Sequence, residues 1–289
     1  MDYKTSGVDI IKGRSFVEYL KVLAPKIDGG FSGMMEIPSG YEKPVLISGA
    51  DGVGTKMNIC RIADDYTTIG QDLVAMCVND VICSGAKPLY FLDYISTKSL
   101  DAHVSDIVYG VNTGCMMAGM ELLGGETAEH CRQIDYDLAG FCTGIVEKNQ
   151  IIDGSNIRAG DVVIGIESSG FHSNGYTLIN DMLWRNKIFY KEMPELLVPT
   201  TIYARLIQHL LDEVPILGMA HITGGGLPEN LPRCIPKGLG VDFDYDAWER
   251  PELFNKIQEA GDIAEEEMRN VFNLGIGFCL VVPQEVAEL

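Results

Sequence analysis

The stretch from Val45 to Lys56 constrains the fold most strongly, because glycines abruptly break an apolar run. Residues 45–47 are Val, Leu and Ile, which is typical of a buried strand. Three glycines, an acid and a base follow within the next nine residues: Gly49, Asp51, Gly52, Gly54 and Lys56. Glycine lets the backbone approach a ligand closely, while aspartate can hold a hard cation and lysine a phosphate. The pattern indicates a strand that ends at a ligand-binding loop.

The order of residues separates this loop from a Walker A loop, which reads G-x-x-x-x-G-K-[ST]. Here Gly54 is followed by Thr55 and then Lys56, the reverse order. Asp51 also lies mid-loop, where its charge would repel a phosphate unless a metal ion lies between them. The loop therefore favours a metal–nucleotide site of another kind, with a tight strand-exit turn as the alternative.

The length of 289 residues predicts two domains. We expect them to span residues 1–150 and 151–289, because residues 148–160 contain turn residues typical of a linker. Apolar periodicity predicts helices over residues 12–23, 71–85, 100–120, 177–185 and 201–214, and strands over residues 88–94, 136–147, 162–166 and 216–220. Two short helices and a strand ending at Val282 are expected after Pro251.

The chain is acidic, with 22 Lys and Arg residues against 41 Asp and Glu residues and a net charge of −19. This charge argues against nucleic acid and against an anionic membrane as partners. The eight cysteines form no C-x-x-C pair, so a reducing cytosol is the simple interpretation. No signal-peptide core is present, and no apolar run approaches the roughly 18–20 residues that span a bilayer. We therefore expect a cytoplasmic protein.

Two further segments of the first half carry glycines or acids. Residues 28–33 form a glycine-rich loop suited to a flap over a nucleotide or, equally, to a linker before the first strand. Asn79 and Asp80 interrupt the apolar helix over residues 71–85. Buried polar groups need partners, which a metal shared with Asp51 would supply, as would capping or an internal hydrogen bond.

Glu126 repeats the pattern of the first loop. Leu122 and Leu123 form a short predicted strand, and two glycines precede the acid, so we expect Glu126 at a strand exit. Three carboxylates at glycine-rich turns fit a magnesium–nucleotide site better than three unrelated turns do. The residues therefore predict a site that holds Mg²⁺ and ATP.

In the second half, two predicted strands each lead into glycine and hydroxyl residues before a helix. The first leads to His172, Ser173, Asn174 and Gly175, and the second to His221, Thr223, Gly224 and Gly225. Such residues at a helix N-terminus favour anion binding. His172 can donate to a phosphate or act as an acid or base, although a lone histidine is more often structural. Together the halves predict ATP- and magnesium-dependent phosphoryl transfer to a small anionic substrate.

Over essentially its whole length, the chain resembles the phosphoribosylformylglycinamidine cyclo-ligase (aminoimidazole ribonucleotide synthetase) family of purine biosynthesis. The matching motifs are Tyr3-Lys4-x-x-Gly7-Val8-Asp9, Ser48-Gly49-x-Asp51-Gly52-Val53-Gly54-Thr55-Lys56, Asp72-Leu73-Val74-Ala75-Met76-Cys77-Val78-Asn79-Asp80, Phe91-Leu92-Asp93-Tyr94, Gly124-Gly125-Glu126-Thr127-Ala128-Glu129, Tyr136-Asp137-Leu138-Ala139-Gly140-Phe141, Ser169-Gly170-x-His172-Ser173-Asn174-Gly175-Tyr176, His221-x-Thr223-Gly224-Gly225-Gly226-x-x-Glu229-Asn230 and Phe272-Asn273-x-Gly275-x-Gly277.

The resemblance implies an α+β protein of two domains. The N-terminal mixed-sheet domain would form a β-barrel across a homodimer, and the C-terminal domain would be an α/β sandwich-like unit. The implied reaction converts formylglycinamidine ribonucleotide and ATP to aminoimidazole ribonucleotide, ADP and phosphate. ATP would phosphorylate the formamide oxygen, and an amidine-side nitrogen would then attack that carbon and close the ring.

Carried over by position, the resemblance also implies site residues. The ATP-binding residues are Lys21, Gly29, Gly30, Gly33, Asp51, Gly52, Gly54, Thr55, Lys56, Asn79 and Asp80. The magnesium ligands are Asp51, Asp80 and Glu126, and the substrate-binding residues are Ser173, Asn174, Gly175, Thr223, Gly224 and Gly225. The catalytic residues are His172, His221, Asp51 and Lys21, with the two histidines as candidates for proton handling.

The chain departs from the family pattern in places. The loop at residues 130–134 is short, the segment between Arg185 and Pro199 is compact, and family members continue past the equivalent of Leu289, so we expect a shortened C-terminal domain. The alternatives to a cyclo-ligase are another kinase or synthetase of the superfamily, such as selenophosphate synthetase, thiamine monophosphate kinase or a hydrogenase maturation protein, and an inactive dimeric binding relative.

Overall fold

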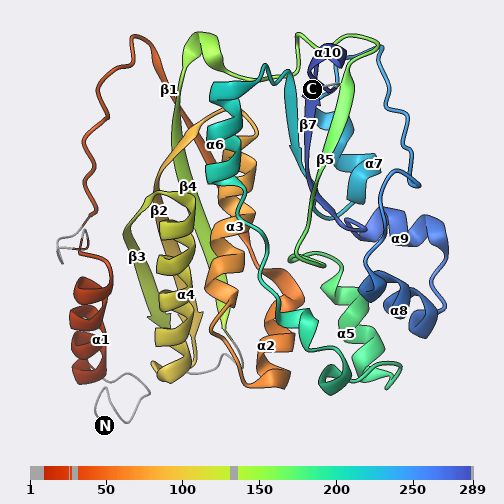
Figure 1. The fold of residues 1–289 in the computed structure, drawn as a ribbon. Helices are drawn as coiled ribbons and strands as arrows, with labels where there is room; N and C mark the ends of the chain where they lie inside the picture. The colour runs from red at the N-terminus through yellow and green to blue at the C-terminus, as the bar shows by residue number, and fades with distance from the viewer. Residues whose placement is uncertain (1–9, 26, 28–31, 131–135, 288–289) are drawn as a thin grey trace.

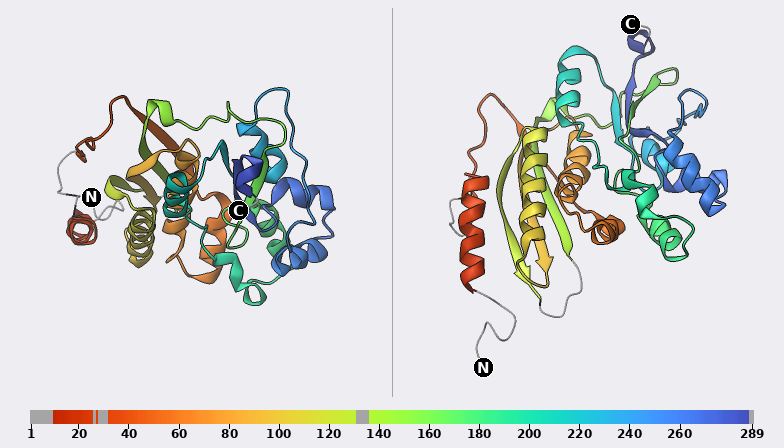
Figure 2. Two further views of the ribbon diagram at one scale, coloured as in Figure 1. Left: turned by 45° about the horizontal axis from the view of Figure 1, so that its top comes forward. Right: turned by 60° about the horizontal axis from the view of Figure 1, so that its bottom comes forward.

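The computed structural model describes residues 10–25, 27, 32–130 and 136–287, which form two domains, each built on one open β-sheet (Figure 1). Helix α3 (Ile69–Ile82) lies between the two sheets in every view (Figures 1 and 2). The predicted boundary between residues 150 and 151 falls in a segment that connects the sheets, and its exact position stays a prediction.

The sheet of the N-terminal domain has the strand order β1-β4-β2-β3. Its strands are β1 (Pro44–Gly52), β2 (Lys87–Thr97), β3 (Glu121–Glu129) and β4 (Asp137–Glu147). Strand β4 pairs antiparallel with β1 and β2, whereas β2 and β3 are parallel. Parallel neighbours require a crossover connection, which α4 (Ala102–Ala118) provides. Asp101 caps that helix by accepting from the backbone N–H groups of His103 and Val104, and Gly119 ends it at φ +74°.

The two faces of this sheet have different environments. Alternation along β1 directs the Gly49 and Asp51 side-chain positions toward α3, because a Cβ at Gly49 would contact Val81 and Asp80. Leu46 and Ala50 lie on the opposite face, and register places Phe141 of β4 beside Ala50 and Tyr94 of β2 on that same face. Leu46, Tyr94 and Phe141 are 53%, 37% and 46% exposed. The sheet therefore has one buried face and one open apolar face.

The C-terminal domain is built on an antiparallel sheet of order β5-β7-β6. Its strands are β5 (Val162–Glu167), β6 (Gly218–His221) and β7 (Ile276–Val282). Its helices are α5 (Tyr176–Trp184), α6 (Ala204–Glu213), α7 (Gly226–Asn230), α8 (Glu252–Gly261), α9 (Glu265–Val271) and α10 (Gln284–Ala287). Strand β7 is buried along its whole length, as expected for a central strand between two neighbours.

The main hydrophobic core is shared by both domains. Side chains of α3, such as Leu73 and Val78, belong to the same cluster as Ile207 of α6 and Phe278 of β7. A second cluster packs α5, α8 and α9 against Ile59 of α2 (Met57–Ala63). Helix α1 (Ile10–Leu23) contacts α4 at the β3 side of the first sheet (Figures 1 and 2). The apolar packing therefore fixes the orientation of the two domains.

Most elements expected from the sequence are confirmed to within a few residues, but the ends of two strands are not. Strand β1 continues through Gly49 and Asp51 to Gly52, all paired with β4, so the expectation that Asp51 lies in a loop after the strand is wrong. Strand β3 continues through Glu126, which is paired with Tyr94, so the prediction of a strand exit before Glu126 is wrong. The physical reason lies in Gly125, where any side chain would collide with the Asp93 carboxylate, so this glycine permits close strand packing instead of a turn. Helix α6 starts at Ala204 because the backbone of Thr200 and Thr201 is held by side chains of α3.

Within the described residues, no helix has both the length and the apolar character required to cross a membrane.

Candidate active site at the domain junction

Two carboxylates meet where β1 ends beside α3. Asp51 is the penultimate residue of β1 and Asp80 lies in the last turn of α3, and both are exposed. The pKa of Asp51 is raised, first by partial desolvation and further by the charge of Asp80, while the Gly52 N–H and His221 act in the opposite direction. Two acids that repel each other at one place are suited to a cation; that they bind one stays a prediction.

His221 joins this pair from the other domain. Its Nδ1 lies 2.9 Å from Asp80 Oδ1, and its side chain is only 1% exposed. Its Nε2 lies 3.4 Å from the Nδ2 of Asn79. An amide Nδ2 can only donate, so this geometry assigns the imidazole proton to Nδ1, where it is donated to Asp80. Asp80 thus orients a histidine whose Nε2 faces the amide of Asn79.

Asn79 is satisfied by hydrogen bonds within the chain. Its Nδ2 donates to the carbonyl of Thr201 at 2.9 Å, and its Oδ1 accepts from the N–H of Tyr203 at 3.1 Å. Of the two explanations for this buried amide, internal hydrogen bonding therefore matches the structure. Asn79 holds the segment before α6 against α3 and orients His221.

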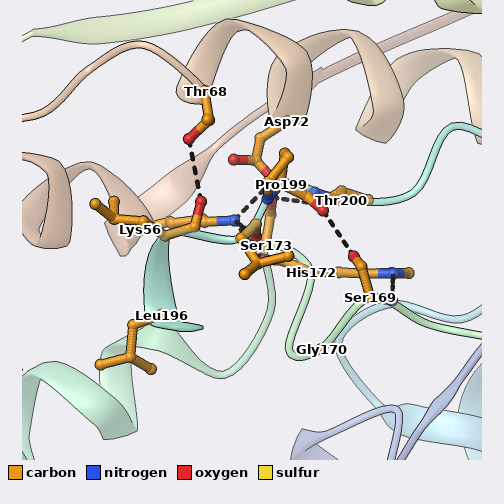
Figure 3. A network of polar contacts seen from close by, with 12 residues as sticks. Lys56, Thr68, Asp72, Ser169, Gly170, His172, Ser173, Leu196, Pro199 and Thr200 are labelled. Atoms are coloured by element: carbon orange, nitrogen blue, oxygen red, sulfur yellow. Dashed lines mark hydrogen bonds and ion pairs between the residues drawn. The ribbon is translucent and has the colours of Figure 1, made fainter. Parts of the chain in front are cut away.

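Lys56 lies in the segment that follows β1, and its side chain is fully buried. Figure 3 shows it among its polar partners. Its Nζ donates to Asp72 Oδ1 at 2.8 Å, to the carbonyl of His172 at 2.9 Å and to the carbonyl of Val198 at 2.8 Å. An ammonium group has three N–H donors, so all of them have acceptors in the protein. The sequence predicted Lys56 as a nucleotide contact, whereas the structure places it in a network that joins the domains.

His172 is buried at the base of the C-terminal domain's first glycine-rich loop, with φ +59°. Its Nε2 accepts from the Ser169 N–H at 3.2 Å, and its Nδ1 is buried with no hydrogen-bond partner among the described residues. Burial, followed by the charges of His221 and Lys56, lowers the pKa of His172 well below its usual range. His172 is therefore neutral at physiological pH and positions the loop that follows it.

The two glycine-rich loops of the C-terminal domain lie next to each other. A Cβ at Gly224 would lie 3.8 Å from Asn174 Oδ1, and the Nδ2 of Asn174 is buried without a partner among the described residues. Gly175 has φ +78° and Gly225 has φ +94°, so both positions favour glycine. These loops combine a buried amide donor that lacks a partner with glycine backbone at positive φ, an arrangement that can bind an anion.

The N-terminal loop contacts the same region. Thr55 Oγ1 lies 3.1 Å from Thr177 Oγ1, and the Thr55 carbonyl accepts from Asn180 Nδ2 at 2.9 Å. The turn before them contains Gly54 at φ +52°, and Gly52 precedes it at the end of β1. Residues 52–55 and the start of α5 therefore form one continuous wall across the junction.

A pocket of about 270 Å³ opens beside Asp80 and His221 and is also lined by Ser84, Asn230 and Arg233. Arg233, which the sequence analysis did not single out, supplies a positive charge there. Asn230 donates through Nδ2 to the carbonyls of Gly224 and Gly226 and so holds the second glycine-rich loop. A larger cavity of about 700 Å³ lies on the C-terminal domain, but its lining does not include Asp80 or His221.

Other predicted residues lie elsewhere. Lys21 is on α1, where its Nζ forms an ion pair with Glu18 at 2.8 Å, and α1 lies at the β3 side of the sheet (Figure 1). Glu126 and Asp51 occupy opposite edge strands, roughly 14 Å apart at the usual strand spacing, and alternation directs Glu126 to the open face with Tyr94. Gly33 packs against Leu123 of β3. Gly29 and Gly30 lie outside the described residues.

The acids at the junction fit a magnesium ion that is bound together with a nucleotide. Among the described residues, no group of three or more His, Cys, Asp and Glu side chains is arranged to hold a metal without help. Mg²⁺ commonly uses one or two carboxylates together with substrate phosphates and water. Asp51 and the Oδ2 of Asp80 are the groups that would hold it.

This fold and junction define the class of AIR synthase related proteins. Residues 32–146 match the family model for the N-terminal domain of that class, and residues 158–289 match the model for its C-terminal domain. Within this class, the chain belongs to the phosphoribosylformylglycinamidine cyclo-ligase family.

The relatives that support this assignment are similar along the whole chain. The cyclo-ligase of Prochlorococcus marinus strain MIT 9313 is 49% identical, with 100% of this chain and 90% of the relative covered. That of Synechococcus sp. strain CC9605 is also 49% identical, covering 98% and 88%.

Solved structures with the same fold are more distant in sequence. E. coli HypE, a hydrogenase maturation protein, has a TM-score of 0.67 at 16% identity and covers 97% of this chain and 85% of its own. AaThiL, described in complex with AMPPCP and TMP, has a TM-score of 0.62 at 15% identity and covers 99% and 88%. At such identities these neighbours establish the fold alone.

Proposed function

We propose that this chain converts formylglycinamidine ribonucleotide and ATP to aminoimidazole ribonucleotide, ADP and phosphate. The observation that carries this proposal is the junction itself, where Asp51, Asp80 and His221 lie together beside two glycine-rich loops. The cyclo-ligase relatives cover the whole chain at about half identity. The same fold in more distant proteins does not favour their activities, because those identities are 14–17%.

The first step is transfer of the γ-phosphoryl group of ATP to the formamide oxygen, with release of ADP. Asp51 and Asp80 would hold Mg²⁺, which when bound would supply neutralisation of the phosphate charge. The Asp80 Oδ1 that accepts from His221 is unavailable to the cation in this arrangement, which leaves Oδ2 for the metal. Residues 52–55 position the nucleotide from the N-terminal side.

In the second step, a nitrogen of the amidine attacks the activated carbon, a proton leaves that nitrogen, and phosphate departs with the former formamide oxygen. His221 is the candidate to take this proton, because Asp80 orients its imidazole and stabilises the imidazolium that forms, once its Nε2 releases the bond from Asn79 Nδ2. His172 lacks such a carboxylate, since its Nδ1 has no hydrogen-bond partner among the described residues and its Nε2 accepts from Ser169, so it acts by holding the loop. Asn174, Thr223 and Gly224 bind the ribose phosphate, with Arg233 as a nearby cation.

The open face of the N-terminal sheet supports a homodimer in which two such sheets pack as a β-barrel. Leu46, Tyr94 and Phe141 are exposed on this face, and contiguous apolar surface of this kind is characteristic of interfaces. Glu126 lies on the same face, so any role in metal or nucleotide binding would have to involve the partner subunit. Lys21 and the flap at residues 29–33 are proposed to contact ATP only after α1 moves or a second chain binds.

The test is direct measurement of turnover by the purified chain with the amidine substrate, ATP and Mg²⁺. ADP release and formation of the aromatic amine should appear together, in equal amounts. ADP release without ring closure would favour a kinase of the same fold. Absence of both at saturating substrate would favour a binding protein and would overturn the proposal.

A further inference from the structure

The network around Lys56 and Asp72 connects the two domains through a buried ion pair (Figure 3). Lys56 precedes α2 in the N-terminal domain, and its ammonium group reaches the carbonyl of His172 in the C-terminal domain and that of Val198 in the segment before α6. Both charged side chains are 0% exposed. One lysine therefore ties three segments to the turn that follows β1 and Asp51.

Asp72 extends these ties from the other side of the ion pair. Its Oδ1 accepts from Ser173 Oγ at 3.0 Å, from the Thr200 N–H at 2.7 Å and from Thr200 Oγ1 at 2.6 Å, in addition to Lys56. Ser173 belongs to the glycine-rich loop that faces the junction. The ion pair consequently fixes the distance between α3, this loop and residues 198–200.

The pair is poorly suited to a purely stabilising role. Desolvation of two charges usually offsets their attraction, and well-packed apolar side chains of similar volume are often as stable. In addition, the Oδ2 of Asp72 is buried with no hydrogen-bond partner among the described residues, which costs stability. The bonds terminate on the carbonyl of His172, which has an unfavourable positive φ, and on the adjacent Ser173. What the pair supplies is a defined position for this loop.

We propose that Lys56 and Asp72 are positioning residues that lock the loop Ser169–Gly175 of the C-terminal domain to residues 53–56, the turn that follows β1 and Asp51 in the N-terminal domain. Lys56 acts from beneath the site and does not contact the nucleotide. This lock holds Ser173 and Asn174 of the C-terminal domain at a fixed distance from Asp51 of the N-terminal domain. Its effect on turnover rests on the proposed function, whereas its effect on the loop does not.

The main test compares wild type with the double variant Lys56→Met/Asp72→Leu, which replaces both charges with apolar side chains. We expect cooperative unfolding to be retained, kcat to fall by roughly tenfold or more, and the Kd for ATP to change by less than about threefold. A rise in the Kd for ATP of roughly tenfold would show that Lys56 contacts the nucleotide and would overturn the proposal. An unchanged kcat would also overturn it.

A milder pair of variants keeps the proposal testable if the double variant does not fold. Thr200→Val removes one hydroxyl donor to Asp72, while Thr68→Val removes a hydroxyl that donates to the Leu197 carbonyl at 3.1 Å without contacting the ion pair. Thr200→Val should accelerate hydrogen exchange in residues 169–175 by roughly fivefold or more, and Thr68→Val should not. Equal exchange in both variants would contradict the lock.

Hydrogen exchange also separates this inference from the proposed reaction. If the wild type forms no aminoimidazole product but Thr200→Val still accelerates exchange in residues 169–175, the reaction is wrong and the lock is correct. If the wild type is active and exchange in this loop does not respond to Thr200→Val, the lock is wrong and the reaction stands.

Discussion

His221 and Asp80 form a hydrogen bond of 2.9 Å across the domain junction, so a residue at the end of β6 is oriented by a carboxylate on α3. Because both domains contribute to this pair, its geometry depends on their relative position. The same α3 residue lies close enough to Asp51 to raise the pKa of that acid. One carboxylate, Asp80, therefore interacts with both His221 and Asp51.

Removal of the His221 imidazole should lower kcat without unfolding the protein. We expect His221→Gln to reduce kcat by about 10²-fold, since a positioned general base typically contributes 10²–10⁴-fold. Asp80→Asn should also be impaired, and the double variant should be little worse than the more impaired single variant because the two residues act as a unit. Steady-state kinetics of the three variants measures this, with the exposed His209→Gln as control. Fully additive losses would contradict a coupled pair.

Asp51 should be required for magnesium-dependent turnover but not for folding. Asp51→Asn keeps the shape of the side chain and removes the charge that would hold Mg²⁺, so we expect kcat to fall by roughly 10²-fold or more. The thermal midpoint should stay within a few degrees of wild type, because the side chain is exposed and surface changes usually alter stability by less than about 0.5 kcal/mol. If a magnesium titration of Asp51→Asn reaches nearly the wild-type kcat, the assignment of Asp51 as a metal ligand is wrong.

Gly175 tests the geometry of the loop Ser169–Gly175. It has φ +78°, and any Cβ there would collide with the ring of Phe272. Gly175→Ala should therefore lower the free energy of unfolding by about 2 kcal/mol or more. Gly240→Ala is the matched control, because a Cβ at Gly240 has open space around it. Urea unfolding of both variants is the measurement, and equal effects would be evidence against a strained, closely packed loop.

Asp93 should make the protein less stable as the pH rises. Burial raises the pKa of its carboxyl to about 7, whereas an aspartate in an unfolded chain ionises near about 3.9. Between the two pKa values the Asp93 carboxyl keeps its proton in the folded chain but has lost it in the unfolded chain. The free energy of unfolding therefore declines as the pH rises toward about 7.

From about pH 5 to pH 7 the decline should amount to about 2–3 kcal/mol. Asp93→Asn cannot ionise and should lose less stability over this range than wild type does. Urea unfolding at the two pH values measures the difference, and parallel pH profiles for the two proteins would refute it. The lowered pKa of His172 acts in the opposite direction: it reduces stability as the pH falls below the unfolded value of about 6.5. This effect is the same in wild type and in Asp93→Asn, because both proteins contain His172.

Phe141 should contribute to self-association. Phe141→Glu places a charge on the open face of the N-terminal sheet, and we expect it to weaken a homodimer by roughly thirtyfold or more. Leu206→Glu, at an exposed position on α6, is the control. Analytical ultracentrifugation over a concentration series distinguishes the two. A wild-type chain that remains monomeric at high concentration would remove the basis for a barrel between subunits.

The sequence was most informative where a polar residue follows or interrupts an apolar strand or helix. Asp51, Asp80 and His221 each follow or interrupt an apolar element, and polar residues at such places commonly converge in open sheets. Glu126 shows the limit of this rule, because glycines within a strand and glycines at its exit look alike until the neighbouring strand is known. Its separation from Asp51 is set by strand order and side-chain alternation, both of which are long-range properties.

Lys56 and Asp72 show a second limit. A lysine next to glycines looks like a phosphate ligand, yet its acceptors come from residues 72, 172 and 198, which no local pattern connects to it. Asp72 carried one local signal, a charge among the apolar residues of a predicted helix. Asn273 carried the same kind of signal, a polar residue between Phe272 and Leu274. In the structure its Oδ1 accepts from Ser168 Oγ, and its Nδ2 donates to the carbonyl of Gly170. Buried polar side chains of this kind indicate that a partner exists, but not which one.

Helix α3 packs into the core that both sheets share, which has a consequence for how the molecule comes apart. Leu73 and Val78 are covered by elements of both domains. If either domain unfolded alone, these side chains would be exposed to water and the other domain would lose part of its core. The chain should melt in one calorimetric transition, despite its two sheets. A protease that cuts between the sheets, near residue 154, would yield two fragments that stay associated, since separation would expose the apolar surface of α3 to water.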